Sequence, residues 1–279
     1  MATAAIPVRT LRKLITTLEA AITLTLANPK PRSVHRLRTT TRRIEAQLEL
    51  LALLPELADH ALPDHAKLAK KIRRLLRKVR RAAGHVRDLD VQQSLAETRS
   101  PRLREEAHRL CDLLKERRGE EARHLLHILR KHEAGLIRKL EALMEALAPA
   151  ESLTLSLPQL TRLTLLWFTH NTPANMNLSH RQLHSLRRNA KIARYMIESG
   201  LPATKGDKGR DKVVIRTRRL AGVFEALQQS GGSWHDWLTL SETARNELGS
   251  SSGLAQSFTR HRERSLADYL RRLKANPVA

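Results

Sequence analysis

The chain has 279 residues and a hydrophobic content of 41%, which excludes general disorder and allows one large domain or two modest ones. Its 51 Lys and Arg against 28 Asp and Glu give a formal net charge of +23. This charge predicts a polyanionic partner, and nucleic acid, inorganic polyphosphate and an anionic membrane surface are the candidates. Aromatic residues make up only 3% of the chain, which argues against single-stranded nucleic acid held by base stacking.

The N-terminal segment predicts a helix over residues 7–27, opened by Pro7 and ended by the NPKP sequence. It lacks the succession of basic start, apolar run and cleavage site that a secretory signal has. No apolar run of about 18 residues that could span a bilayer occurs, so we expect a soluble cytoplasmic protein without a membrane partner. The single Cys111 lies in an apolar row and is expected in the core rather than at a reactive site.

The next helix, expected over residues 33–54, has two faces of opposite character. At about 100° per residue, its basic side chains share one face and its large aliphatic side chains share the other. The basic face carries His35, Arg38 and Arg42, with Arg43 at its margin, and the apolar face carries Leu37, Ile44, Leu48 and Leu51. The apolar face suits packing in a hydrophobic core, and the basic face suits binding of an anion.

A dense run of positive charge follows, within a helix expected over residues 64–83. Between Lys67 and Arg87 there are ten Lys or Arg residues and no Asp or Glu. Because such a run repels itself, an anion-binding site explains it better than a solvated surface does. The anion-binding candidates that we select from it are Arg74, Arg77 and Arg81.

Breaks and linkers divide the rest of the chain. Gly84 is expected to end the cationic helix, and residues 101–147 predict two long helices with a turn near residues 131–134. The best linker is the proline-bracketed, charge-poor segment 148–158. We therefore expect a first bundle at residues 1–150 and a second at residues 151–279.

The second half again predicts only helices. They are expected over residues 159–170, 179–199, 212–229, 234–248 and 254–274, with breaks at the GGS and GSSSG sequences and a mobile glycine-rich loop at 200–211. The helix at 179–199 repeats the two-faced pattern. Its basic candidates are His184, Arg187, Arg188, Lys191 and Arg194, and its apolar face carries Leu186, Ala190, Ala193 and Ile197.

The spacing of these features indicates an internal duplication. His184 follows His35 by 149 residues, and the Gly232 and Asp236 pair follows the Gly84 and Asp88 pair by 148. We therefore expect an all-α fold of two pseudo-symmetric helical bundles. Their two basic helices would meet in a central basic groove or pore.

These motifs resemble those of the CHAD family, the conserved histidine α-helical domain. The resemblance depends on VHRLRTTTRRI and GHVRDLDV in the first half, and on LHSLRRNAKIARY and a degenerate GSWHDW in the second. It implies two four-helix bundles that bind inorganic polyphosphate in a basic central channel. By resemblance, this channel would be faced by His35, Arg38, Arg42, Arg43, His184, Arg187, Lys191 and Arg194.

The resemblance also implies a role without catalysis. Many relatives carry a triphosphate-tunnel domain with an ExExK motif, and this sequence has no such motif. We therefore expect a polyphosphate-binding module that is not an enzyme, has no cofactor, and associates with polyphosphate granules in the cytoplasm. The second repeat has Ser233 to His235 where the first has His85 to Arg87, so polyphosphate contact is expected to be heavier in the first half.

Three alternatives stay open at the level of sequence. A nucleic-acid binder could use the same basic surface, although no known reading motif is present. A phosphoanhydride enzyme would need a general base or a metal set, and the spaced pairs His180/His184 and His124/His127 have no carboxylate or cysteine nearby to complete a zinc site. Finally, the two motif histidines could bridge the halves structurally, and Asp88 and Asp236 could cap a helix or pair with an arginine.

Overall fold

The computed structural model describes residues 4–57, 62–97, 101–172, 178–202 and 211–275, and within these ranges the chain is almost entirely helical. The expected loop at 200–211 lies mostly outside the described residues. The eight described α-helices are α1 (Pro7–Ala27), α2 (Pro31–Leu53), α3 (Ala66–Glu97), α4 (Arg104–Ala146), α5 (Leu157–Asn171), α6 (His180–Glu198), α7 (Lys212–Leu248) and α8 (Gly253–Ala275). The expected all-α class is confirmed.

Short elements complete the described chain. Three 3₁₀ turns occupy Leu54–Glu56, Pro101–Leu103 and Ala148–Ala150. Strand β1 (Ala4–Ala5) pairs antiparallel with β2 (Leu155–Ser156), with Ala4 opposite Ser156. These two residue pairs connect the N-terminal segment to residues 155 and 156, which lie in the segment that we expected to be a linker.

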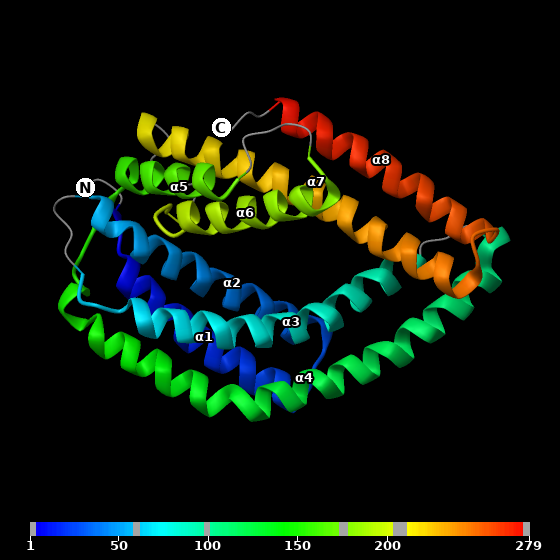
Figure 1. The fold of residues 1–279 in the computed structure, drawn as a ribbon, viewed down its shortest axis with the longest axis horizontal. Coiled ribbons are helices and arrows are strands. Elements are labelled where there is room, and N and C mark those ends of the chain that lie inside the picture. Colours follow the sequence, from blue (N-terminus) through cyan, green and yellow to red (C-terminus); the bar gives the residue numbers. More distant parts are fainter. Residues whose placement is uncertain (1–3, 58–61, 98–100, 173–177, 203–210, 276–279) are drawn as a thin grey trace.

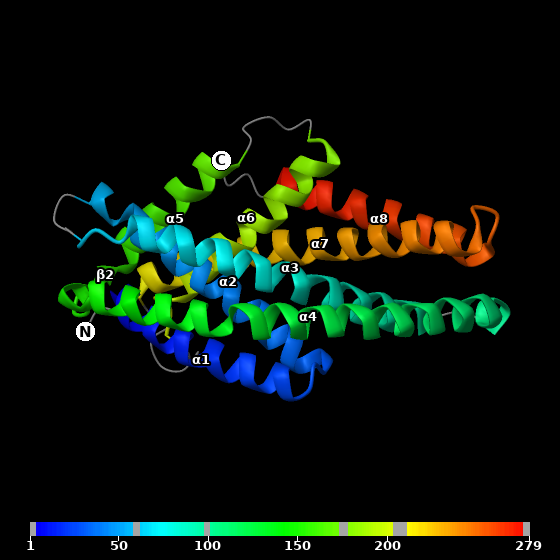
Figure 2. The same cartoon turned by 60° about the horizontal axis from the view of Figure 1, so that its bottom comes forward.

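Two long helix pairs give the molecule its shape. Helix α3 packs along α4, and α7 packs along α8 (Figure 1). Seen from the side, these pairs extend in the same direction, away from α1, α2, α5 and α6 (Figure 2). Helices α2 and α6, which carry the two basic motifs, contact each other directly. None of the described helices is both long enough and apolar enough to cross a bilayer.

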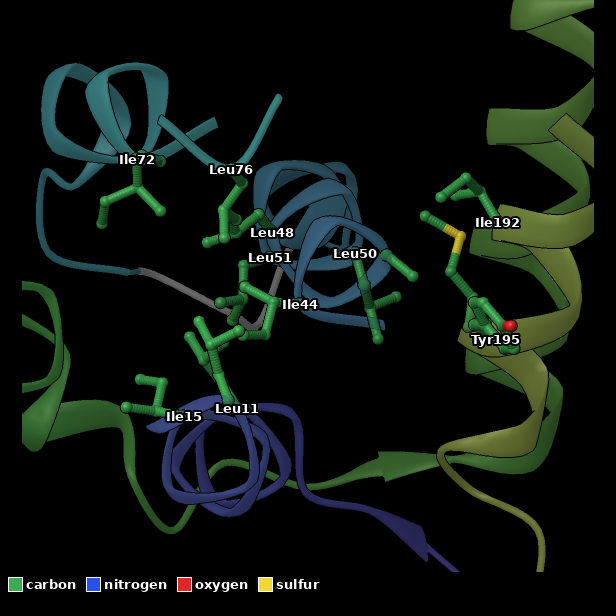
Figure 3. Close-up of a cluster of buried hydrophobic side chains, with 14 of the residues drawn as sticks. Leu11, Ile15, Ile44, Leu48, Leu50, Leu51, Ile72, Leu76, Ile192 and Tyr195 are labelled. Atoms are coloured by element: carbon green, nitrogen blue, oxygen red, sulfur yellow. The ribbon is translucent and has the colours of Figure 1, made fainter. Parts of the chain in front are cut away.

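The expected apolar faces form the core. Leu37, Ile44, Leu48 and Leu51 of α2 are fully buried, as are Ala190, Ala193 and Ile197 of α6. Figure 3 shows α2 between two sets of side chains, with Ile44 facing Leu11 of α1 and Leu50 facing α6. The largest core cluster includes residues on both sides of position 150. The division at 150/151 and the pseudo-symmetry of the bundles stay predictions.

Three expected helix breaks are wrong. Helix α3 runs through Gly84, α4 runs through residues 131–134, and α7 runs through residues 231–233. An interior glycine costs a helix only about 1 kcal/mol relative to alanine, and packing against neighbouring helices outweighs this. The break after α7 is confirmed, where Gly249 adopts a φ of 85°.

The start of α2 also differs from the prediction. Lys30 precedes the helix, Pro31 occupies its first turn, and Ser33 lies inside it. The Ser33 hydroxyl donates to the carbonyl oxygens of Asn28 and Lys30, at 2.8 and 2.9 Å. Ser33 therefore stabilises the preceding turn, and the helix begins two residues before the predicted start at residue 33.

Candidate functional site

A cavity of about 750 Å³ lies where α2, α3 and α6 converge. We call it the basic cavity. Seven arginines and one lysine line it: Arg38 and Arg42 from α2, Arg77, Arg80 and Arg81 from α3, and Arg187, Arg188 and Lys191 from α6. Three carboxylates, Glu45, Glu49 and Asp88, and three histidines, His85, His184 and His235, share the lining. The cavity thus gathers positive charge from both halves of the chain.

Most of the candidate residues selected from the sequence meet here. The lining includes Arg38, Arg42, Arg77, Arg81, His184, Arg187, Arg188 and Lys191. His35 is exposed and is not in the lining, and burial, followed by the charges of Arg87 and Lys191, lowers the pKa of its ring. The regular spacing of cations on α2 and α6 therefore identified side chains that converge in space.

Arg43 and Arg194, in contrast, are not in the lining of this cavity. Their guanidinium carbons lie 5.2 and 5.1 Å from the ring centroid of Tyr195, on the side where α2 packs against α6. Arg43 pairs with Glu198 at 3.7 Å, and Arg194 pairs with Glu198 at 3.3 Å and with Glu225 at 3.0 Å. The structure thus places both in an ion-pair cluster around an aromatic ring.

Arg74 is exposed and also lies outside the lining. It shares an angular position on α3 with Arg81 but lies seven residues earlier, which is about 10 Å along the helix axis. At this end of the cavity Arg73, one residue before Arg74, pairs with the lining residue Glu49 at 3.2 Å.

Arg80, the most tightly paired cation of the cavity, was not among the residues predicted from the sequence. Its Nη2 donates to Glu45 Oε1 at 2.9 Å, and its Nη1 lies 2.8 Å from Glu45 Oε2. Arg42 Nη1 lies 3.8 Å from the same carboxylate. Glu45 follows Arg42 by three residues on α2, so a signal was present in the sequence, but the pairing with α3 needed the tertiary structure. Its carboxylate offsets part of the positive charge.

Each basic helix also has an arginine that lies against a glycine of the next helix. Arg38 Nε is 3.7 Å from where a Cβ on Gly84 would lie, and Arg187 Nε is 4.0 Å from the same position at Gly232. Arg38 Nη2 lies 3.9 Å from Asp88 Oδ1. Both Asp88 and Asp236 lie inside continuous helices, so the pairing alternative holds for Asp88 and the capping alternative is wrong for both.

Burial and mutual repulsion keep several of these groups less charged than usual. Burial, followed by Arg187 and Arg188, lowers the pKa of His184 to about 4. Burial, followed by Arg187 and His184, lowers the pKa of His235 to about 3. The two rings lie 4.7 Å apart. Burial, followed by Arg38 and Arg42, lowers the pKa of Lys191 to about 7, so this lysine titrates near neutral pH.

Charged donors of the cavity are left without partners. The Nε atoms of Arg38 and Arg42 are buried and have no hydrogen-bond acceptor within the described part of the chain. Burial, followed by Arg80 and Arg38, also lowers the pKa of Arg42 to about 9. Buried, repelling donors of this kind are stabilised by a multidentate anion. No group of three or more described His, Cys, Asp or Glu residues is arranged to hold a metal ion.

Comparisons with known proteins agree with this architecture. The family model described as the CHAD domain matches residues 9–245. The crystal structure of the CHAD domain from the plant Ricinus communis is similar with a TM-score of 0.63 and 16% identity, covering 100% of this chain and 90% of that one. PptA from Streptomyces chartreusis is similar with a TM-score of 0.54 and 15% identity, covering 96% and 98%. None of the curated proteins matches the chain.

Proposed function

Because the chain belongs to the CHAD-domain family, as the match over residues 9–245 shows, we propose that it binds inorganic polyphosphate in the basic cavity without catalysing a reaction. The observation that carries this proposal is the convergence of eight cationic side chains from three helices on one cavity of about 750 Å³. A cavity of this charge is a site for a strongly anionic ligand. The resemblance of the basic motifs to the CHAD family supports polyphosphate as that ligand.

The chemistry of polyphosphate suits this lining. Each internal phosphate carries about one negative charge, and the chain has no bases or side groups to be recognised. Arginines can form two parallel hydrogen bonds to phosphate oxygens, and a lysine supplies a point charge. Bound phosphate would accept from the guanidinium groups that line the cavity, and its field would raise the pKa of Lys191 back toward the usual range.

Two of the three lining histidines, His184 and His235, favour binding over catalysis. A general acid or base transfers protons best when its pKa lies near the working pH. The pKa values of His184 and His235, about 4 and 3, lie far below neutrality. At neutral pH each neutral ring can donate one N–H to an anion. Proton transfer by either ring would be inefficient.

Nucleic acid is the second candidate, because the exposed cations extend beyond the cavity. Arg74, Lys78 and Arg181 are exposed on α3 and α6 outside the basic cavity. A duplex is too wide and stiff to enter a cavity between helices, so it would use these surface charges instead. The two ligands therefore require different residues, which makes them separable by experiment.

The cellular part of the proposal follows from binding. A protein whose cavity holds long polyphosphate chains would associate with polyphosphate granules in the cytoplasm. A fluorescent fusion would test this by its position relative to the granules in cells with and without polyphosphate.

The direct test is a competition titration near physiological salt. Labelled long-chain polyphosphate would be displaced by unlabelled polyphosphate, duplex DNA, RNA or ATP at matched phosphate concentration. We expect polyphosphate to compete more strongly than the others by at least about 100-fold. Equal competition by DNA or RNA would overturn the proposal in favour of a general polyanion surface. Release of phosphate from the bound chain would overturn the non-catalytic part.

A further inference from the structure

A small hydrophobic cluster lies on the apolar face of α6, distinct from the largest core cluster. Four buried side chains from three helices form it: Leu183 and Leu186 from α6, Trp234 from α7, and Tyr269 from α8. His184 and Arg187, which line the basic cavity, belong to the same turn of α6 as the two leucines. The cluster therefore supports the part of α6 that supplies His184 and Arg187 to the cavity.

Tyr269 contacts this turn of α6 through its hydroxyl. The side chain is fully buried, and the hydroxyl donates to the backbone carbonyl oxygen of Leu183 at 3.1 Å. In an α-helix this carbonyl oxygen also accepts from the backbone N–H four residues later, which here belongs to Arg187. The Tyr269 ring in turn stacks on Trp234, with the centroids 6.0 Å apart and an angle of 26° between the planes. Tyr269 therefore connects α7 and α8 to the backbone turn that carries Arg187.

The three helices approach one another most closely at Gly231 of α7. A Cβ on Gly231 would lie 2.8 Å from Tyr269 Cζ and 3.1 Å from Arg187 Cβ. A Cβ this close to a buried ring would force one of the helices to move. The absence of a side chain at Gly231 thus lets Tyr269 and Arg187 pack on the same point of α7, and α7 and α8 together determine where Arg187 leaves the backbone of α6.

Arg38 and Arg187 hold equivalent places in the two basic motifs, but they are held in different ways. Arg38 lies 3.9 Å from Asp88. Arg187 makes no direct ion pair with any residue that the structure describes, and burial, partly offset by Asp236, lowers the pKa of its guanidinium. A largely buried arginine without a close carboxylate depends on the packing around it for its position. At Arg187 this packing comes from α7 and α8.

We propose that Tyr269 is a positioning residue of the basic cavity, which holds Arg187 in place for the anion through its hydrogen bond to Leu183. The inference rests on the proposed function for the identity of that anion, inorganic polyphosphate. Tyr269 is not in the lining of the cavity, so its hydroxyl acts on binding through Arg187. The family match ends at residue 245, before α8 begins at Gly253, and therefore does not itself assign a role to this helix.

The test compares Tyr269→Phe with Tyr195→Phe in a titration with long-chain polyphosphate. These are the two tyrosines of the chain, both are buried, and phenylalanine keeps the ring of each. The hydroxyl of Tyr195, on α6, makes no hydrogen bond with a described residue. We expect Tyr269→Phe to weaken binding about three- to tenfold, because the bond that holds the turn is lost, and Tyr195→Phe to change it less than about twofold. Equal effects of the two variants would overturn the proposal.

Two further backgrounds separate positioning of Arg187 from a general loss of structure. In Arg187→Gln, the added Tyr269→Phe should weaken binding less than about twofold, because the side chain that it positions has been removed. In Arg77→Gln, which removes another lining cation, Tyr269→Phe should keep its full effect. Similar losses in the two backgrounds would show that the hydroxyl does not act through Arg187, and would overturn the proposal.

A measurement without ligand separates this inference from the proposed function. Burial, followed by Arg187, lowers the pKa of His184 to about 4. If Tyr269→Phe releases Arg187, the pKa of His184 followed by NMR should rise by at least about 0.3, and Tyr195→Phe should leave it unchanged. An unchanged pKa in Tyr269→Phe would overturn the inference even where polyphosphate binds. A raised pKa in a chain that does not bind polyphosphate would support the positioning role and reject the proposed ligand.

Discussion

A second cavity, of about 560 Å³, lies between α3, α4 and α7 and shares His85 and Asp88 with the basic cavity. Its lining has four carboxylates and one arginine, so we call it the acidic cavity. The change in charge occurs along α3 within about two turns, because Arg77, Arg80 and Arg81 line the basic cavity whereas Asp88 and the later Gln92 line the acidic one. One continuous helix therefore presents a cation-rich segment to one cavity and an acceptor-rich segment to the other.

Helix α7 also lines both cavities, one after the other along its length. His235 lines the basic cavity, and Thr239, Glu242, Thr243 and Asn246 line the acidic one. Had α3 and α7 broken at their interior glycines, the two segments of each helix would not share one axis. The continuity of the helices sets the two cavities side by side. The net charge of a chain thus determines which partners it attracts from a distance, and the local lining determines the charge of the ligand that each cavity could hold.

Salt should have the largest effect on the basic cavity. A ligand held through six to ten phosphate contacts loses roughly 10³ to 10⁵ in affinity between about 50 and 200 mM salt, by analogy with DNA. Titrations with polyphosphate over this range would check the expected loss. A flat response to salt would contradict an electrostatic site.

Charge reversal within the basic cavity should have the next largest effect. The variant Arg77→Glu/Arg81→Glu/Arg188→Glu changes three exposed lining residues, so helix content should be retained. Polyphosphate affinity should fall at least about 100-fold, since each charged hydrogen bond contributes roughly 1.5–3 kcal/mol. Direct binding measurements, with circular dichroism for helix content, would check this.

The matched control reverses three exposed cations of the same two helices outside the cavity. Arg74→Glu/Lys78→Glu/Arg181→Glu changes the net charge by the same amount and should weaken polyphosphate binding less than about tenfold. Duplex DNA should show the reverse sensitivity if it uses the outer surface. A loss of polyphosphate affinity as large in the control would move the site away from the cavity.

This pair of variants also marks how far the sequence could identify the site. The period of the cations on α2 and α6 placed Arg38, Arg42, Arg187 and Lys191 on faces away from the core, and these faces meet in the fold. Periodicity fixes an angle around a helix but not where a cavity ends along it. A run of charge is even less specific: Arg74 was selected together with Arg77 from the cationic run of α3, although only Arg77 is in the lining of the cavity.

The predicted helix breaks were wrong because tertiary packing, which the local sequence does not show, requires the glycines. Glycine weakens a helix locally, and this suggested a break at Gly84 and at residues 231–233. In the structure a Cβ on Gly231 would lie only 2.8 Å from Tyr269 Cζ of α8 and 3.1 Å from Arg187 Cβ. This glycine serves close helix packing rather than a turn. The partner that requires it is 38 residues away, beyond the reach of local pattern.

Proton linkage should give a smaller effect, limited to the basic cavity. Lys191 has a pKa of about 7 in the empty protein, because burial and the facing Arg38 and Arg42 of α2, with Arg187 and Arg194 of α6, disfavour its charge. A bound polyanion favours the charged form, so binding takes up a proton. Polyphosphate affinity should therefore fall as pH rises from 7 to 9, by up to about tenfold per pH unit.

The stability of the empty protein should show the opposite trend. The folded pKa of Lys191 lies below the usual lysine pKa of 10.5, so above pH 7 the unfolded state binds more protons and stability rises with pH toward 10.5. Thermal unfolding with and without polyphosphate at pH 7, 8 and 9 would check both trends. Lys191→Gln should flatten the two trends, and Lys78→Gln, outside the cavity, should not.

The smallest change in affinity should come from Glu45→Gln, which removes negative charge from the basic cavity. Glu45 accepts from Arg80 at 2.9 Å and lies 3.8 Å from Arg42 Nη1. Without this carboxylate, two largely buried arginines lose their counter-charge, so the empty protein should be destabilised by roughly 1–3 kcal/mol. Polyphosphate should nevertheless bind a few-fold tighter, because its phosphates no longer face that carboxylate.

If a bound anion supplies the negative charge that the basic cavity lacks, Glu45→Gln should lower the stability of the empty protein and raise its affinity for polyphosphate. Denaturant unfolding without ligand measures the first effect, and titration with polyphosphate measures the second. Glu141→Gln, on the exposed surface of α4, is the control for charge alone and should move neither quantity beyond about 0.5 kcal/mol. If Glu45→Gln weakened binding instead, this carboxylate would be positioning Arg80 and Arg42 for the ligand. Its role would then be organisation of the cavity, and the affinity would depend on geometry more than on net charge.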